Sequence, residues 1–190
     1  MFVILCLPKD KKMTNSLPFP APDEYAPYYK EYVQRAIARQ DVLSALSLQI
    51  DELHAALARL TDEQSRFRPG PMEWSIKEVL GHMIDVERIF SYRLLRISRN
   101  DATPLSGFED GDYVREAGFD RFPMPDLLAE FEFMRRANNL AIKNMSEEAT
   151  LRRGTASDAP FSVRALICIM VGHVDHHLAS LREKYLPGVK

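Results

Sequence analysis

Apolar residues recur every three to four positions along four stretches of the chain, which is the pattern of helices with one buried face. The first stretch runs roughly from Arg39 to Leu60, and the second from about Ser75 to Ser98. The third runs from Asp126 to about Met145, and the fourth from about Ser162 to Tyr185. No convincing run of alternating apolar and polar residues predicts a strand. The pattern therefore predicts an all-α protein built as a four-helix bundle.

Helix-breaking and helix-capping residues mark the ends of these stretches. Prolines between residues 18 and 27 keep the start of the chain extended or turn-like, so ordered helix is expected near Tyr28 or later. Proline and glycine at 69–71 interrupt the chain before Ser75, which fits a capping box with the glutamate three residues later. The connection over residues 99–125 is too long for a tight turn, and it permits a crossover in place of simple up-and-down order.

The apolar positions also define the helix faces that we expect to be buried. In the third stretch these positions are Leu127, Phe131, Met134, Leu140 and Ala141. In the fourth stretch they are Val163, Leu166, Met170, Val174, Leu178 and Leu181. The core of the bundle should form where such faces meet.

Length and charge narrow the class of protein. The 190 residues contain no Gly/Ser linker or charge block, so we expect one domain over residues 28–190, preceded by an extended or disordered tail over residues 1–27. Lysine plus arginine (25) nearly balances aspartate plus glutamate (27), for a formal net charge of -2. This balance gives no electrostatic reason to expect a nucleic acid or an anionic membrane as partner.

Cysteine content and the N-terminus indicate the compartment. Cys6 and Cys168 have no Cys-x-x-Cys neighbour, which argues against a disulfide framework or a thiolate zinc site. The apolar start at residues 1–7 is too short to span a bilayer and lacks the basic region and cleavage site of a signal peptide. Met13 offers an alternative start that would leave residues 1–12 outside the native protein. We therefore expect a cytoplasmic protein without a membrane partner.

The five histidines are the strongest candidates for a functional site. On a helical wheel of about 100° per residue, His173 and His177 fall inside the buried face of the fourth stretch, one turn apart, so their rings project side by side into the interior. His82 lies on the shoulder of the buried face of the second stretch and can point inward. His176 lies on the flank of the fourth stretch. His54 flanks the buried face of the first stretch, as a rival third member of the group or an edge histidine.

Imidazoles gathered in an apolar interior need partners for their ring nitrogens, and a divalent cation collects their lone pairs. Zinc, nickel, copper and ferrous iron all accept neutral imidazole. A lone histidine on an apolar face is more often a hydrogen-bonded core residue, so the spacing alone leaves both interpretations open. Val174 stands where a zincin motif needs its general base, and no pair of Glu-x-x-His motifs indicates a di-iron site. A metal site here would be mononuclear.

Two segments resemble the DinB-like family of metal-binding four-helix bundles. They are WSIKEVLGHMIDVER at residues 74–88 and VGHVDHHL at residues 171–178. The similarity also includes the Pro/Gly break before the first segment, the run DATPL at 101–105 and the Phe-rich third stretch. It covers most of the chain from about residue 28 to residue 186 and leaves only the N-terminal tail outside.

The resemblance implies a metal site made by His82, His173 and His177, because the family uses one histidine from the second helix and a His-x-x-x-His pair from the fourth. It also implies a crossover topology, frequent homodimers, and zinc or nickel as the usual ion. It fixes the activity poorly, because relatives include thiol-dependent transferases or isomerases, proteins described as hydrolases, and many with no assigned reaction.

Three protein nitrogens leave coordination positions for water or substrate, which is the pattern of a catalytic metal. The ion could lower the pKa of a bound water to about 7, or stabilise the thiolate of a low-molecular-weight thiol as nucleophile. We therefore expect a metal-dependent thiol transferase or a hydrolase with a small-molecule substrate. The alternatives are a non-catalytic, stress-associated module in which the ion is structural, and a bundle that binds haem or another cofactor through histidine and methionine.

Residues near the histidines are candidates for supporting roles. Asp85, Asp175 and His176 could orient a ligand imidazole through its other nitrogen, although Asp85 fits a solvated charge equally well.

Residues further from the histidines have weaker claims. The segment 107–122 carries aromatic and acidic residues that could form a wall over the metal or simply pin a long connection. Arg93 shares the face of His82 but lies about 16 Å away along the helix axis, too far to touch the ion. Trp74 is expected to plug one end of the bundle.

Overall fold

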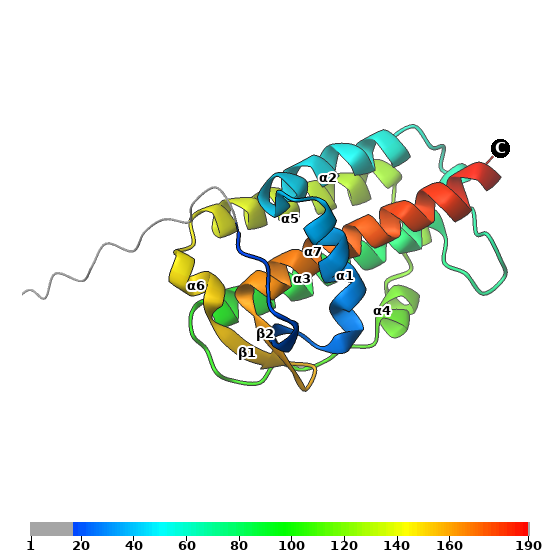
Figure 1. Cartoon of the computed structure of the whole chain (residues 1–190). Helices are drawn as coiled ribbons and strands as arrows, with labels where there is room; N and C mark the ends of the chain where they lie inside the picture. The colour runs from blue at the N-terminus through cyan, green and yellow to red at the C-terminus, as the bar shows by residue number, and fades with distance from the viewer. Residues whose placement is uncertain (1–16, 190) are drawn as a thin grey trace, which may run out of the picture.

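The computed structural model describes residues 17–189, and four of its helices form the bundle. They are α2 (Val42–Leu57), α3 (Ile76–Ser98), α5 (Met124–Lys143) and α7 (Val163–Ser180). Helices α2 and α3 each pack against both α5 and α7 (Figure 1). Helix α2 therefore lies diagonally opposite α3, and α5 lies diagonally opposite α7. The predicted four-helix bundle with a crossover is confirmed, but the place expected for the crossover is wrong. The connection 99–125 joins the neighbouring helices α3 and α5, whereas the connections 58–75 and 144–162 span a diagonal.

The first predicted helix differs most from the structure. A separate helix, α1 (Lys30–Ala38), ends just before Gln40, whose φ of 61° is in the left-handed region, and α2 begins after Asp41. The Asp41 carboxylate accepts the backbone N–H of Ser44 and caps α2. The chain therefore turns sharply at residues 39–41, where a continuous helix was expected from Arg39.

Helix α1 lies along α7 at very close range. A Cβ atom built on Gly172 would lie 1.8 Å from the carbonyl oxygen of Tyr32, so no larger residue fits at this position without moving α1. The absence of a side chain at position 172 is what allows the two backbones to meet beside His173.

The ends of α3 and α7 follow the predicted caps. Ser75 accepts the backbone N–H of Glu78 while the Glu78 side chain accepts the N–H of Ser75, as a capping box requires. Ser162 caps α7 in the same manner through the N–H of Ala165. Beyond α7 the chain continues as a π-turn at Leu181–Tyr185. The helices that carry His82, His173 and His177 therefore start at well-defined points.

Two predicted core positions of α5 are wrong. Leu140 is 62% exposed and Ala141 is also exposed, whereas Arg135, Asn138 and Ile142 point inward. The inward face of α5 carries polar residues because they serve a buried hydrogen-bond network, and a pattern of apolar residues cannot reveal such a face.

The buried network joins all four bundle helices. Arg135 on α5 donates to both carboxylate oxygens of Glu87 on α3, at 2.8 and 2.7 Å, and to Oε1 of Gln49 on α2, at 2.8 Å. The Gln49 amide in turn donates to the carbonyl of Val171 and to the Asp175 carboxylate on α7, both at 2.8 Å. Every member of this set has its partner inside the protein, as a buried polar network requires.

A small sheet that the sequence pattern did not predict follows α6 (Glu147–Leu151). Strands β1 (Arg153–Ala156) and β2 (Ala159–Ser162) pair antiparallel through a tight turn. Ser157 and Asp158 in this turn have φ of 49° and 57°, which fits the two left-handed positions of a two-residue hairpin. Four residues per strand are too few for alternation to be visible in sequence.

The remaining elements lie in the connections. Helix α4 (Asp110–Ala117) interrupts the connection between α3 and α5. Short 3-10 turns occur at Pro22–Glu24, Pro27–Tyr29, Gln64–Arg66, Phe119–Arg121 and Leu186–Gly188. Among the helices of residues 17–189, none has the length and apolar character needed to cross a membrane. The predictions made for residues 1–12, including Cys6, concern positions outside the described residues.

We predict that Arg135→Met lowers the free energy of unfolding by about 3–5 kcal/mol, because it leaves the Glu87 carboxylate buried without its cation. Arg136→Met is the matched control, since Arg136 is largely exposed and pairs with Glu132 one turn away on α5. Its effect should stay within about 0.5 kcal/mol. Urea unfolding of the two variants measures the difference, and equal losses would contradict the role given to Arg135.

Candidate metal centre

Three histidines from two helices meet inside the bundle. The Nε2 atom of His173 on α7 lies 3.0 Å from Nε2 of His82 on α3 and 3.1 Å from Nε2 of His177 one turn along α7. If each ring offers one nitrogen as a ligand atom, these three nitrogens all lie within 4.8 Å of one another. The structure thus brings together the three histidines that the sequence singled out.

These separations suit ligands of one ion. Imidazole nitrogens bind zinc at about 2.0–2.1 Å, so two ligands of the same ion lie about 2.9 Å apart at a right angle and about 3.3 Å apart at the tetrahedral angle. Hydrogen bonding alone cannot satisfy the cluster, because a neutral Nε2 either carries a proton or offers a lone pair, and His173 Nε2 faces two other nitrogens. The donor set therefore fits a divalent cation.

Burial keeps the three rings in the form that binds metals. His82 and His173 are only 6% and 5% exposed. Burial lowers the pKa of His82 to about 4, and burial together with the neighbouring imidazoles holds the pKa of His173 and His177 well below the usual range of histidine. The imidazoles are neutral at neutral pH as a result, with lone pairs available for a cation.

Two aromatic residues hold the histidine rings. The Trp74 ring lies 4.9 Å from the His82 ring, so the residue expected to plug the bundle end also contacts the site. Tyr32 on α1 packs edge-on against His173 at 5.6 Å and against His176 at 5.4 Å. Sequence reasoning missed Tyr32, and the only signal for it was the glycine beside His173, which permits another backbone to approach.

The other candidate residues lie around the cluster without a direct bond to it. The Asp175 carboxylate accepts Arg39 Nε at 2.9 Å and Nη2 at 2.6 Å, in addition to the Gln49 amide. His176 Nδ1 lies 3.7 Å from the carboxylate of Glu31. Within residues 17–189, no hydrogen bond joins Asp175 or His176 to a ring nitrogen of the cluster.

Asp85 and His54 also stand apart from the cluster. Asp85 is half-buried, and burial raises the pKa of its carboxyl group. His54, the rival third histidine, bonds instead to Glu132 on α5 at 2.9 Å. It therefore belongs to a different part of the bundle.

The histidine cluster borders a cavity of about 300 Å³, to which His82 and His173 contribute part of the wall. Five aromatic residues line the cavity and form what we call the aromatic wall: Tyr28, Tyr29, Tyr32, Phe90 and Phe108. Glu109 and Asp110, at the start of α4, add carboxylates to the wall. A volume of this size is at the lower end of small-molecule sites, about 300–1,000 Å³.

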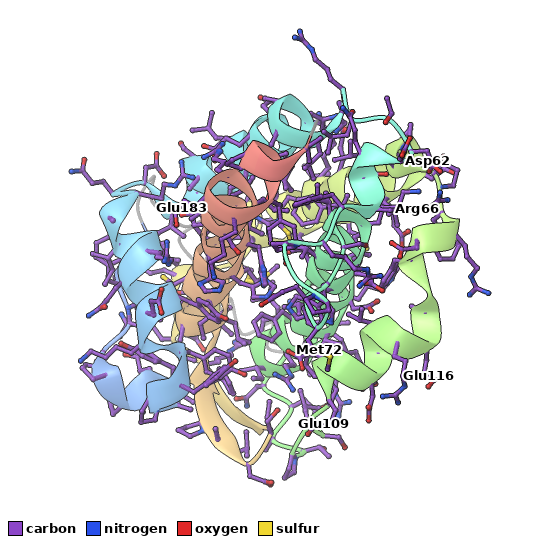
Figure 2. The ribbon with its side chains drawn as sticks, turned by 90° about the vertical axis from the view of Figure 1, so that its right-hand side faces the viewer. Asp62, Arg66, Met72, Glu109, Glu116 and Glu183 are labelled. Atoms are coloured by element: carbon purple, nitrogen blue, oxygen red, sulfur yellow. The ribbon has the colours of Figure 1, made fainter. Side chains whose placement is uncertain are left out.

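The segment 107–122 has both of the roles considered for it. Phe108, Glu109 and Asp110 line the cavity, whereas Phe119 is buried and its ring lies where a Cβ on Gly81 would be, 2.2 Å away. In Figure 2, which views the bundle from the end where the chain terminates, Glu109 and Glu116 flank α4. Phe119 therefore anchors the connection on α3, directly beside His82.

Comparison with known proteins assigns the chain to a family. The sequence model of the DinB superfamily matches residues 45–181, and the chain belongs to this superfamily. All three clustered histidines lie within the match. No curated protein matches the sequence.

Among solved structures, YfiT from Bacillus subtilis is described as a probable metal-dependent hydrolase with an unusual four-helix bundle topology. It is 14% identical to this chain, with a TM-score of 0.69, and the match covers 86% of this chain and 89% of YfiT. This likeness confirms the fold.

An ion pair fastens the segment that carries the aromatic wall. Glu24 is 2% exposed and accepts Arg164 Nε on α7 at 2.7 Å, so this segment packs onto the bundle although residues up to 27 were expected to form an extended or disordered tail. This contact holds the pKa of the Glu24 carboxyl group at about 2, against an ordinary 4.5. A carboxyl group whose pKa is lowered by folding stabilises the protein above its unfolded pKa.

We predict that Glu24→Gln lowers the free energy of unfolding by about 1–3 kcal/mol at neutral pH. The difference from the unsubstituted protein should persist down to about pH 5 and shrink as the pH falls from 4.5 toward 2, because the carboxyl group of the unfolded chain takes up a proton over this range while the native carboxylate stays ionised. Urea unfolding across this pH range measures it. A difference that does not change with pH would show that the charge of Glu24 has no role.

Proposed function

We propose that this chain is a metal-dependent enzyme acting on a small molecule, in which His82, His173 and His177 bind one divalent ion. The observation that carries the proposal is the convergence of three imidazole nitrogens beside a cavity large enough for a small ligand, with His82 and His173 in the cavity wall. A structural metal site is closed by four protein ligands, whereas three ligands beside a cavity leave room for a reacting group.

The reaction we propose is a hydrolysis or a transfer to a low-molecular-weight thiol, with zinc or nickel as the ion. When bound, such an ion supplies Lewis-acid chemistry. Glu109 and Asp110 lie on the same cavity wall, where a carboxylate can accept the proton of an incoming water or thiol. The aromatic wall excludes bulk water and binds the apolar part of the substrate.

The description of YfiT as a probable metal-dependent hydrolase supports the hydrolytic form of the proposal. Its low identity to this chain does not decide whether water or a thiol receives the transferred group, because one fold accommodates several chemistries. A screen of ester and amide substrates in water, run beside the same substrates with several small thiols, separates the two forms by whether product depends on the thiol.

The first test is metal content. Protein purified without an affinity tag should contain about one divalent ion per chain, and His82→Ala, His173→Ala and His177→Ala should each lower the content at least tenfold, because two imidazoles bind far more weakly than three. His54→Ala is the matched control, since His54 pairs with Glu132 away from the cluster, and it should retain the ion. Elemental analysis measures the metal content of each variant. Full metal content in His82→Ala, or an equal loss of metal in His54→Ala, would contradict the assignment of the three ligands.

The second test separates a catalytic ion from a structural one. The Arg135 network and the core already join α3 to α7, so the metal-free protein should remain folded, with a cooperative thermal transition, while turnover is lost. Circular dichroism after removal of the ion by a chelator measures the fold. An unfolded metal-free protein would favour the alternative of a non-catalytic module in which the ion is structural.

A further inference from the structure

Arg93 on α3 is a buried cation without a counter-ion. Its side chain belongs to a residue that is 1% exposed, and no ion pair of residues 17–189 includes it. Nη2 donates to the carbonyl of Ser106 at 3.1 Å and to the hydroxyl of Ser157 at 2.8 Å. Nε and Nη1 are buried and have no hydrogen-bond partner among the described residues. Two charged donors are therefore left unsatisfied.

The contrast with Arg135 shows that this fold can satisfy a buried guanidinium when its role is structural. Arg135 has a carboxylate and an amide oxygen as acceptors, whereas the oxygens near Arg93 are neutral ones, namely the Ser106 carbonyl and the hydroxyls of Ser157 and Tyr29. The rings of Phe90, Phe108 and Phe161 lie 5.4, 5.9 and 5.9 Å from its Cζ. Such contacts with aromatic rings offset only part of the cost of burying an ion.

Arg93 lies at the boundary between two cavities. It lines a cavity of about 500 Å³ between α3 and the segment 104–108, and Phe108 lines both this cavity and the one beside the histidines. Ser157, which accepts from Arg93, lines the histidine cavity. On α3, His82, Val86 and Phe90 also line that cavity at successive turns. Because helical side chains lean toward the N-terminus, the Arg93 guanidinium lies closer to His82 than the separation along the axis implies.

We propose that Arg93 binds the carboxylate of a small substrate whose apolar body lies along the aromatic wall and whose reacting end faces the histidines. The inference rests on the proposed function, because it takes the histidine cavity as the substrate site. Phe108, which is partly exposed and borders both cavities, is the side chain whose reorientation opens the path to Nε and Nη1.

The charges around Arg93 select a monoanion. The other arginines that line the larger cavity are already paired, Arg88 with Glu130 and Arg96 with Asp101, so a single positive charge is uncompensated. A phosphate would bring a second negative charge toward Glu109 and Asp110 on the neighbouring wall. A carboxylate on an aromatic or aliphatic body matches both the charge and the wall.

The test is calorimetric titration of the full-length protein with benzoate, phenylacetate and 3-phenylpropionate, each beside its neutral amide. We expect at least one carboxylate to bind, its amide to bind at least tenfold more weakly, and Arg93→Met to weaken the carboxylate at least tenfold. Arg88→Met is the matched control, because Arg88 lines the same larger cavity but is exposed. The affinity of this variant for the carboxylate should stay within twofold of that of the unsubstituted protein. Absence of carboxylate binding, or equal binding of acid and amide, overturns the inference.

Stability and metal content complete the test. An unpaired buried charge destabilises the ligand-free protein, so Arg93→Met should melt no lower than the unsubstituted protein. A melting temperature several degrees lower would show that Arg93 is structural and would overturn the inference. If the protein contains its ion but binds no carboxylate, the inference fails and the proposed function stands. If the protein never contains an ion but still binds a carboxylate through Arg93, the proposed function fails and the assignment of Arg93 as the carboxylate-binding residue stands.

Discussion

A single guanidinium sets the positions of the helices that carry the histidines. Arg135 joins α5 to Glu87 on α3 and to Gln49 on α2, and Gln49 extends the connection to the backbone of α7 at Val171. Hydrogen bonds of this kind are directional, and in a dry interior a broken one leaves a charge or a dipole unpaired. The α3 and α7 backbones cannot slide past each other without breaking them. His82 and His173 each lie within two turns of this network, so the network fixes their relative position.

Polar groups are distributed unevenly around the site, and this asymmetry gives the cavity a direction. The lining combines two imidazoles, the carboxylates of Glu109 and Asp110, and five aromatic rings. A molecule that enters such a space meets different chemistry at each point, which suits one orientation better than the rest. The connection between α3 and α5 provides both the carboxylates of the cavity and their anchor, since Phe119 fixes this connection against Gly81.

The parts of the structure that depend on regular spacing were predictable. The bundle, the capping of α3 by Ser75 and the inward direction of His173 and His177 all follow from periodicity and local hydrogen bonding. The break at Gln40 was not, because a left-handed residue in the middle of a helical pattern leaves no composition signal. The same limit applies to the polar face of α5 and to the role of Tyr32, since both arise from contacts between segments distant in the chain.

The histidine cluster also has a consequence for how the chain acquires its structure. His173 and His177 are one turn apart and can meet as soon as α7 forms, but His82 is 91 residues before His173. The third histidine is brought in only after a long loop has closed, a step that is slow compared with the growth of a helix. A folding chain therefore brings His173 and His177 together first, and the cluster of three imidazoles is completed only when α3 packs against α7.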